Sequence, residues 1–360
     1  MRERGQLRLS RLGKNGRSSL SDTRKRGSFI QERNLKLRCL FQNEETTPGR
    51  AGWLPKMVLL WLPCIQAFAH STTQIARADM ELSATQQARP WDRPFWKPIR
   101  GKEGVFTYLV LIHLLSVIGL ILFPLPSLKV IGMTLLFVAF GGLGTTVCYH
   151  RLLAHKTLKV NRFVEQFLIF WAVFNGTGHP ASWVAYHRLH HAVTDLPEDI
   201  SSPKQGGFWW AHLRWLYQTE PADKKHWAPE LTGGIYRIWG WAETPVILLS
   251  IFIGLILGLG WMGFFWIGAL RLVYSLHLQC LVNSLTHLGE AKEGDSSINV
   301  WWLGPFQLTA WGENWHKNHH THAGSARLGL RWYQTDIGWY FIWMLEAIGL
   351  AHSVKRPRAS

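Results

Sequence analysis

The chain has 360 residues, of which 47% are hydrophobic, and it contains 21 Trp residues, far above ordinary usage. Its net charge of +16 is uneven, because residues 1–50 hold 13 Lys and Arg against five Asp and Glu. The four cysteines, Cys39, Cys64, Cys148 and Cys280, have no paired spacing, which argues against a disulfide framework or a Cys-X-X-Cys metal site. Basic residues without a nucleic-acid-binding motif or interleaved aromatic residues indicate contact with anionic membrane lipid and no nucleic-acid partner.

Residues 1–90 are predicted to form a basic, disordered extension, because the first 50 are rich in Arg and Ser and lack hydrophobic periodicity. This composition is typical of an organellar transit peptide. The alternative is that translation starts downstream, at Met57 or Met80. A short apolar run at 57–69 has the character of a signal sequence, but it is too short to span a membrane.

Residues 91–340 are predicted to form a membrane domain with four transmembrane helices, and 341–360 a basic C-terminal tail. Each apolar segment is of roughly spanning length. The segments pair into two hairpins, because only short turns at 124–129 and 258–260 separate their members. The four segments are 105–123, 130–149, 244–259 and 261–282.

Two hairpins place both termini and the mixed polar segments 150–243 and 283–360 on one side of the membrane. Basic residues after the second span assign that side to the cytoplasm or stroma, at a bacterial inner, endoplasmic reticulum or plastid membrane. The segment 163–174 is apolar enough to lie in the interface. The basic residues are Arg151, Lys156, Lys159 and Arg162.

Three histidine clusters with metal-ligand spacing fall on this side, and we expect a cytosolic helical cap to carry them. In the second and third clusters, histidines at i, i+3 and i+4 share one face of a helix. His150 and His155 are about 140° apart around an ideal helix. They therefore serve two different ions or straddle the end of the second span, where helical geometry loosens. The clusters contain His150 and His155; His187, His190 and His191; and His316, His319 and His320.

Two more residues join the candidate site. His287 lies just past the fourth predicted span, and Asn283 is four residues earlier on the same helical face, where it would orient a ligand or act on a metal through a water. His113 and His277 lie inside spans, where ionisable residues are functional candidates. Packing within the helix bundle explains these two equally well.

Eight or nine imidazoles exceed the needs of one zinc ion, which four ligands fill. Imidazole suits iron, and the lack of nearby thiolates disfavours an iron–sulfur cluster. We therefore predict two iron ions, as Fe²⁺. Their chemistry with O₂ supplies the oxidising power to remove hydrogen from an unactivated methylene, which protein side chains lack. A membrane location fits a long acyl chain as substrate.

At these residues the chain resembles the membrane fatty acid desaturases of the acyl-CoA, Δ9 type. The resemblance covers about residues 91–334 and includes Trp183, the GENW lead-in at 312–315 and the NSxxH element at 283–287. It implies an enzyme that uses O₂ and external electrons to introduce a cis double bond into a saturated long-chain acyl group, carried by CoA or by a lipid. It also implies a diiron site with Asn283 bound through a water and with the ligands His150, His155, His187, His190, His191, His287, His316, His319 and His320.

Two departures weaken the inference that the acyl carrier is CoA. Tyr186 stands where acyl-CoA members commonly have Asp, and residues 199–202 read DISS where DPHS is frequent. Asp195 and Asp199 either orient ligand imidazoles or cap and solvate a loop, and Trp183 is a candidate contact for a ligand or the substrate. Because the sequence carries no cytochrome b5 signature, a separate electron donor of the ferredoxin or cytochrome b5 type is expected.

Two other functions compete with desaturation. A related histidine-box hydroxylase or ketolase would use the same diiron core but insert oxygen, so the product, an alcohol or a double bond, separates the two. A metal transporter would place its ligands along a path within the spans. The clusters lie instead at the ends of the spans, which disfavours transport.

Overall fold

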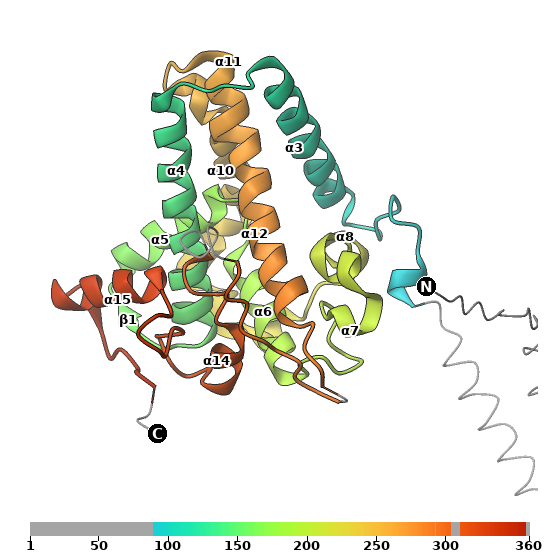
Figure 1. The fold of residues 1–360 in the computed structure, drawn as a ribbon, viewed down its shortest axis with the longest axis vertical. Helices are drawn as coiled ribbons and strands as arrows, with labels where there is room; N and C mark the ends of the chain where they lie inside the picture. The colour runs from blue at the N-terminus through green and yellow to red at the C-terminus, as the bar shows by residue number, and fades with distance from the viewer. Residues whose placement is uncertain (1–88, 292, 304–309, 358–360) are drawn as a thin grey trace, which may run out of the picture. The chain divides into compact units, whose positions relative to one another are not determined.

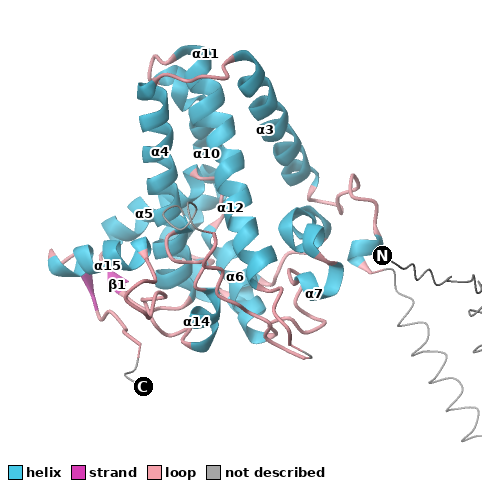
Figure 2. Ribbon diagram, viewed as in Figure 1, coloured by secondary structure: helices cyan, strands magenta, loops and turns pink. Residues whose placement is uncertain are grey.

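Helices make up almost all of the regular structure in the computed structural model, which describes residues 89–291, 293–303 and 310–357 (Figure 1). Within these ranges, strand is confined to one short pair (Figure 2). Within the described residues, four helices are long and apolar enough to cross a membrane. The prediction of an all-α integral membrane protein is therefore confirmed. The four spans are Glu103–Leu122, Leu128–Ala154, Gly234–Ile256 and Gly260–Thr286.

A short link joins the first two spans, and the Ser127 side chain caps the second by accepting a hydrogen bond from the Val130 backbone N–H. Outward-facing side chains on both spans are aliphatic; Ile121 and Leu135 are 72% and 58% exposed. Lipid tails are as apolar as these side chains, so the exposed faces are suited to a hydrocarbon surrounding. The helices of this pair are α3 (Glu103–Leu122) and α4 (Leu128–Leu143).

The second span continues from α4 into η2 (Gly144–Ala154), a π-helical segment that carries the first histidine cluster. Every residue of η2 is buried. The helix α5 (Arg162–Phe174) packs against it. Gly144 permits this close approach, because a Cβ at this position would overlap the α5 backbone at Leu168 and Ala172.

The third span begins earlier than the sequence predicts. Its helix starts at Ile238 instead of about 244 and passes through Pro245. Membrane helices tolerate an internal proline because neighbouring groups satisfy the freed backbone. Gly254 lies against Gly263 of the next span, where a Cβ would overlap the facing backbone. The elements of this pair are α10 (Ile238–Ile256), α11 (Gly260–Gly263), the π-helical η6 (Phe264–Leu270) and α12 (Arg271–Thr286).

Short helices gather around the ends of α12 and η2, whereas the links between paired spans lie at the opposite end of the bundle (Figure 1). The strands β1 (Lys159–Val160) and β2 (Ala351–His352) pair antiparallel. The remaining elements are η1 (Pro90–Asp92), α6 (Pro180–Ala192), α7 (Pro203–Gly206), η3 (Trp210–Arg214), α8 (Trp215–Gln218), α9 (Lys224–Trp227), η4 (Pro229–Leu231), η5 (Gly234–Arg237), α14 (His316–Thr321) and α15 (Ile337–Ala347).

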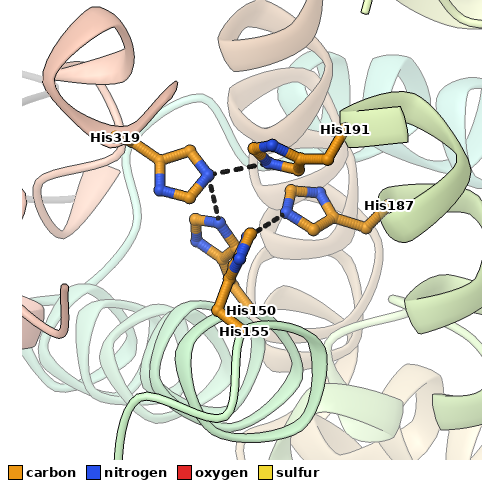
Figure 3. Close-up of side chains that lie close together, drawn as sticks. All are labelled: His150, His155, His187, His191 and His319. Carbon is orange, nitrogen blue, oxygen red and sulfur yellow. Dashed lines mark hydrogen bonds between the residues drawn. The ribbon is translucent and has the colours of Figure 1, made fainter. Parts of the chain in front are cut away.

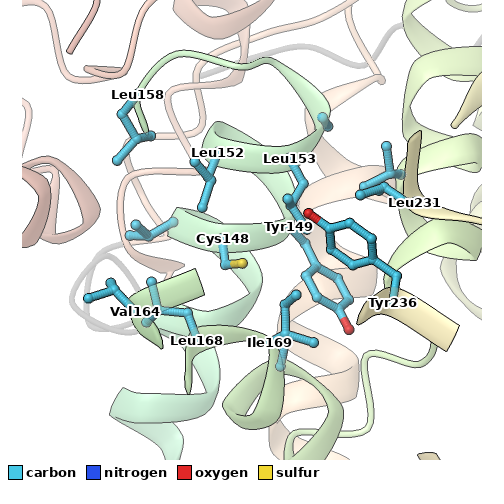
Figure 4. Packing of buried hydrophobic residues seen from close by; sticks show 14 of the residues in the cluster. Cys148, Tyr149, Leu152, Leu153, Leu158, Val164, Leu168, Ile169, Leu231 and Tyr236 are labelled. Carbon is cyan, nitrogen blue, oxygen red and sulfur yellow. The ribbon is translucent and has the colours of Figure 1, made fainter. Parts of the chain in front are cut away.

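A hydrophobic core beside η2 fixes the first histidine cluster in place (Figure 4). Cys148 and Tyr149 of η2 pack among Leu168 and Ile169 of α5, and none of the four is more than 1% exposed. Cys148 is a free thiol within this core. Dense packing of this kind resists displacement of the backbone, so η2 is a rigid platform for its two histidines.

Two predicted regions at the ends of the chain stay predictions. Residues 1–88 lie outside the described residues, so the basic extension predicted over 1–90 is not addressed by the structure. The segment 341–360, predicted to be a basic tail, contains most of α15 and all of β2.

Candidate metal centre

Five histidine rings converge at the C-terminal end of the second span (Figure 3). One ligand nitrogen from each lies within 4.8 Å of those of the others. Their Nε2 atoms face one another, with separations of 2.7 Å for His155 and His187, 2.9 Å for His191 and His319, and 3.1 Å for His150 and His319. The rings come from η2 with the residue that follows it, His155, and from α6 and α14, three elements that are far apart in sequence.

A second group of four rings adjoins the first and contains His190, His287, His316 and His320. His316 Nε2 lies 3.0 Å from His287 Nε2 and 3.1 Å from His320 Nε2. The His320 ring stacks on His191 of the first group, with centroids 4.5 Å apart. The structure therefore brings together all nine histidines that the sequence singles out.

The second and third clusters divide between the two groups in a reciprocal way. In α6, the histidines at i and i+4 join the five-ring group, whereas His190 at i+3 joins the four-ring group. In α14, the histidines at i and i+4 join the four-ring group, whereas His319 at i+3 joins the five-ring group. Each short helix thus contributes to both groups, and the two helices hold them side by side.

The five-residue spacing of the first cluster follows from its π-helical backbone. The His155 N–H donates to the His150 carbonyl oxygen at 3.1 Å, five residues back. An i to i+5 bond closes a wider turn than an α-helix does, so both rings join the same group, with centroids 4.9 Å apart. The sequence allowed two interpretations of His150 and His155. Altered helical geometry at the end of the span fits this arrangement, whereas binding of two different ions does not, because both rings lie in one group.

Asp195 and Asp199 both contact imidazoles of the four-ring group. Asp199 Oδ2 lies 2.8 Å from His190 Nδ1, and Asp195 Oδ2 lies 2.9 Å from His287 Nδ1. Burial by itself would lower the pKa of His190, but the Asp199 carboxylate raises it. Burial by itself would raise the pKa of Asp195, but its hydrogen bond with His287 holds it below the usual range. Each carboxylate thereby fixes the proton on Nδ1 and turns Nε2 inward.

Two further carboxylates contact the histidines, and sequence patterns do not single them out. Glu313 Oε2 lies 2.8 Å from His150 Nδ1, and Asp295 Oδ2 lies 3.4 Å from His320 Nδ1. Glu313 stands within the GENW lead-in to the third cluster, and that position is the signal that could have identified it. No sequence motif identifies Asp295, because it is far from His320 in the sequence and the two come into contact only in the folded chain.

Arg151 links η2 to the third cluster. The sequence suggests only that its charge helps to orient the chain in the membrane. Its guanidinium contacts Asp336 at 2.9 Å and Glu313 at 3.3 Å, and the Arg151 side chain is 1% exposed. A buried charge is tolerated only when it is paired and hydrogen-bonded. Arg151 therefore positions Glu313, and through Glu313 the His150 ring.

The donor set fits metal cations better than a network of imidazoles bonded to one another. His287 Nδ1 donates a hydrogen bond to Asp195, and His320 Nδ1 faces the Asp295 carboxylate at 3.4 Å. Each Nδ1 therefore carries the proton of its neutral ring, and each Nε2 carries a lone pair. Both lone pairs face His316 Nε2, which can carry only one proton. Burial and the neighbouring His320 hold the pKa of His316 well below its ordinary value, so the ring is neutral. A cation bound by the Nε2 atoms removes this conflict, and imidazole without thiolate suits iron.

The other two predicted site residues lie close by. The Trp183 indole stacks on the His187 ring, with centroids 4.9 Å apart and an interplanar angle of 16°. The Asn283 side-chain amide donates to the carbonyl oxygens of Ser201 at 2.9 Å and Ala211 at 2.8 Å. These bonds fix the orientation of the amide, and its link to a metal through water stays a prediction.

The histidines inside the spans do not belong to either group. His113 and His277 lie 2.9 Å apart, His277 continues at 2.9 Å to His212, and His212 contacts Ser284 at 3.0 Å. This series of hydrogen bonds joins α3 to α12 and η3. It corresponds to the bundle contact that was one of the two sequence interpretations.

Comparison with known proteins agrees with this geometry. The family pattern described as fatty acid desaturase matches residues 126–340. The chain is 38% identical to Delta-9 acyl-lipid desaturase 2 of Arabidopsis thaliana over 274 residues, which cover 74% of this chain and 86% of that relative. It is 32% identical to sn-1 stearoyl-lipid 9-desaturase of Synechocystis sp. over 289 residues, which cover 77% and 86%. These matches confirm the resemblance seen in the sequence: the chain is a multi-pass membrane oxidoreductase that belongs to the fatty acid desaturase family, and it resembles Δ9-type members.

Proposed function

We propose that the chain introduces a cis double bond, at the Δ9 position, into a long saturated acyl chain with the help of two iron ions. The observation that carries this proposal is the pair of adjoining groups of five and four imidazoles, each of which would hold one ion. Bound iron would supply the chemistry that lets O₂ remove hydrogen from an unactivated methylene. Overall, O₂, two electrons and two protons convert the saturated chain into the unsaturated chain and two waters.

The residues of the chain bury this site and orient its rings. Five of the nine rings are buried and the other four are partly buried, so contact between the rings and bulk water is limited. Burial and the neighbouring His150 lower the pKa of His155 to about 2, so this ring stays neutral and able to bind a metal. Asp195, Asp199 and Glu313 accept hydrogen bonds from Nδ1–H of His287, His190 and His150, which leaves the Nε2 lone pairs free to bind metals.

We infer that the acyl chain is carried by a membrane lipid and not by CoA. The names of two relatives specify an acyl-lipid and a stearoyl-lipid substrate. Tyr186, the residue before the second histidine cluster, also favours a lipid carrier. Its ring lies edge-on to Trp215 with centroids 5.4 Å apart, and its hydroxyl contacts Lys102 Nζ at 3.3 Å. An aromatic residue with a polar tip is typical of the membrane surface, where lipid headgroups meet acyl chains.

The site is assigned to the cytoplasmic or stromal face, because Lys156, Lys159 and Arg162 follow the second span on that side. Electrons would come from a separate donor of the ferredoxin or cytochrome b5 type. A donor that approaches from the aqueous side reaches the histidine groups at the inner ends of the spans, while the acyl chain approaches from the lipid.

Expression of the full chain in a desaturase-deficient host tests the proposal. The expected product carries a cis double bond whose position mass spectrometry locates, and an alcohol would contradict desaturation. His319→Ala removes the ring that meets both His150 and His191 and should abolish the product. His226→Ala, at an exposed position, is the matched control and should leave the product unchanged. Unsaturated product from His319→Ala would refute the ligand assignment.

A further inference from the structure

Two cavities adjoin between the second and fourth spans. The larger, of about 500 Å³, is lined mainly by apolar side chains of α4, η6 and α12. The smaller, of about 40 Å³, is lined by Thr146 and Glu313, the latter in contact with His150. Both cavities share Val138 and Leu278 as lining residues. The two cavities therefore lie next to each other, on either side of these two side chains, and the smaller one reaches the surroundings of the metal centre.

An acyl chain at the metal centre would place its methyl end in the large cavity. Arg271 and His277 also line this cavity, but they already hydrogen-bond to Asn175 and to His113 and His212. The polar carboxyl end would therefore find few partners there, and burial without hydrogen-bond partners is costly. The methylenes between the reacting carbons and the methyl end then pass through the small cavity. A space of about 40 Å³ holds only a few water-sized groups, so it selects by the width of the chain.

The Trp311 indole forms one wall of the small cavity and is held rigidly. It rests on Gly142 of α4, where a Cβ would overlap the ring carbons Cζ2 and Cη2. The φ of Trp311 is +52°, in the left-handed region that bulky residues rarely adopt. Its carbonyl oxygen accepts hydrogen bonds from Arg151 Nη2 at 2.8 Å and from the Gly338 N–H at 3.2 Å. Strain of this kind persists only where surrounding contacts enforce it, and such positions cluster at functional sites.

We propose that Trp311, seated on Gly142, is the specificity-determining constriction of the acyl path. This inference rests on the proposed function. The fixed indole admits an unbranched, saturated methylene segment on the methyl side of the reacting carbons. It excludes a segment that already carries a methyl branch or a cis double bond, because either is wider than a straight chain.

The test compares two substrates in one host. The full chain is expressed in a desaturase-deficient host that receives equal amounts of a straight saturated fatty acid and one branched near its methyl end. Mass spectrometry gives the ratio of the two unsaturated products. We expect the unaltered chain to prefer the straight substrate and Trp311→Leu to reduce that preference by about tenfold, the scale at which a pocket discriminates one methylene. Trp332→Leu, at a position 91% exposed, is the matched control and should leave the ratio unchanged.

Gly142→Ala supplies the reciprocal test, because its Cβ must displace the indole. We expect it to lower product from both substrates, and the double variant Gly142→Ala with Trp311→Leu to restore product with the relaxed ratio. An unchanged ratio in Trp311→Leu, or unchanged product in Gly142→Ala, overturns the inference while leaving desaturation intact. If the Trp311→Leu protein fails to accumulate, the product ratio of the double variant is measured instead. A relaxed ratio supports the inference and an unchanged ratio overturns it. Absence of product from the unaltered chain overturns the proposed function, and this inference with it.

Discussion

The Asp199 carboxylate accepts a hydrogen bond from His190 Nδ1 at 2.8 Å, and three further donors fix its position. These donors are the Asp195 N–H at 3.0 Å and the N–H and hydroxyl of Ser201 at 3.2 and 2.9 Å. Asp199 is 1% exposed, so water does not compete for the carboxylate. One side chain thus fixes both the proton and the direction of a candidate metal ligand.

Asp199→Asn should therefore weaken iron binding by about 10- to 100-fold, as expected when the partner of a ligand histidine is lost. The amide cannot stabilise the Nδ1 proton as a carboxylate does, so Nε2 becomes a poorer donor. Iron per protein after dialysis against graded chelator measures the effect. Glu198→Gln, at the exposed neighbouring position, should retain iron like the unaltered chain. Equal retention by Asp199→Asn would show that Asp199 does not support the metal.

Gly144→Ala should push η2 away from α5, because the added Cβ overlaps the α5 backbone. Overpacking of this kind costs about 1–3 kcal/mol of stability, and we also expect lower iron content since His150 and His155 move with η2. Thermal unfolding in detergent and metal analysis are the measurements. Gly132→Ala on the same span meets no atom within 4 Å and is the control. If both variants behave alike, the approach of η2 to α5 does not depend on Gly144.

Arg151→Met should destabilise the chain by about 3–5 kcal/mol, because removal of one partner leaves buried charges uncompensated. Asp336 and Glu313 are those charges, at 2.9 and 3.3 Å from the guanidinium. Denaturant unfolding measures the loss. Arg162→Met removes a side chain that is 67% exposed and should cost less than about 1 kcal/mol. A small loss for Arg151→Met would mean that water replaces the guanidinium.

The metal-free chain should lose stability as the pH falls below about 6.5, the ordinary pKa of histidine. Burial lowers the pKa of His320 to about 4, so between these values the unfolded chain binds more protons than the folded chain. Stability then rises with pH across this window. His316 and His319 have pKa values shifted in the same direction, whereas Asp199 raises that of His190 and opposes the trend. The melting temperature of chelated protein should fall between pH 7 and 5, and a constant or rising value would contradict the assignment.

The sequence by itself determined the elements that depend on short stretches of chain. Twenty or so apolar residues define a membrane span whatever surrounds them, and three of the four spans begin near their predicted residues. The third does not, because the tolerance of Pro245 depends on the helices beside it. The nine histidines were also identifiable, since spacing within one helical turn is a local property.

Only the tertiary structure decided how those histidines divide. Spacing at i, i+3 and i+4 fixes the angles of His187, His190 and His191 around one helix, but not which rings approach from other helices. The assignment of His190 to one group and His187 to the other follows from the packing of α6 against η2 and from the rings that α14 brings to its histidines. Glu313 and Asp295 meet their histidines for the same reason. Such pairings depend on contacts between segments distant in sequence, and no local pattern encodes them.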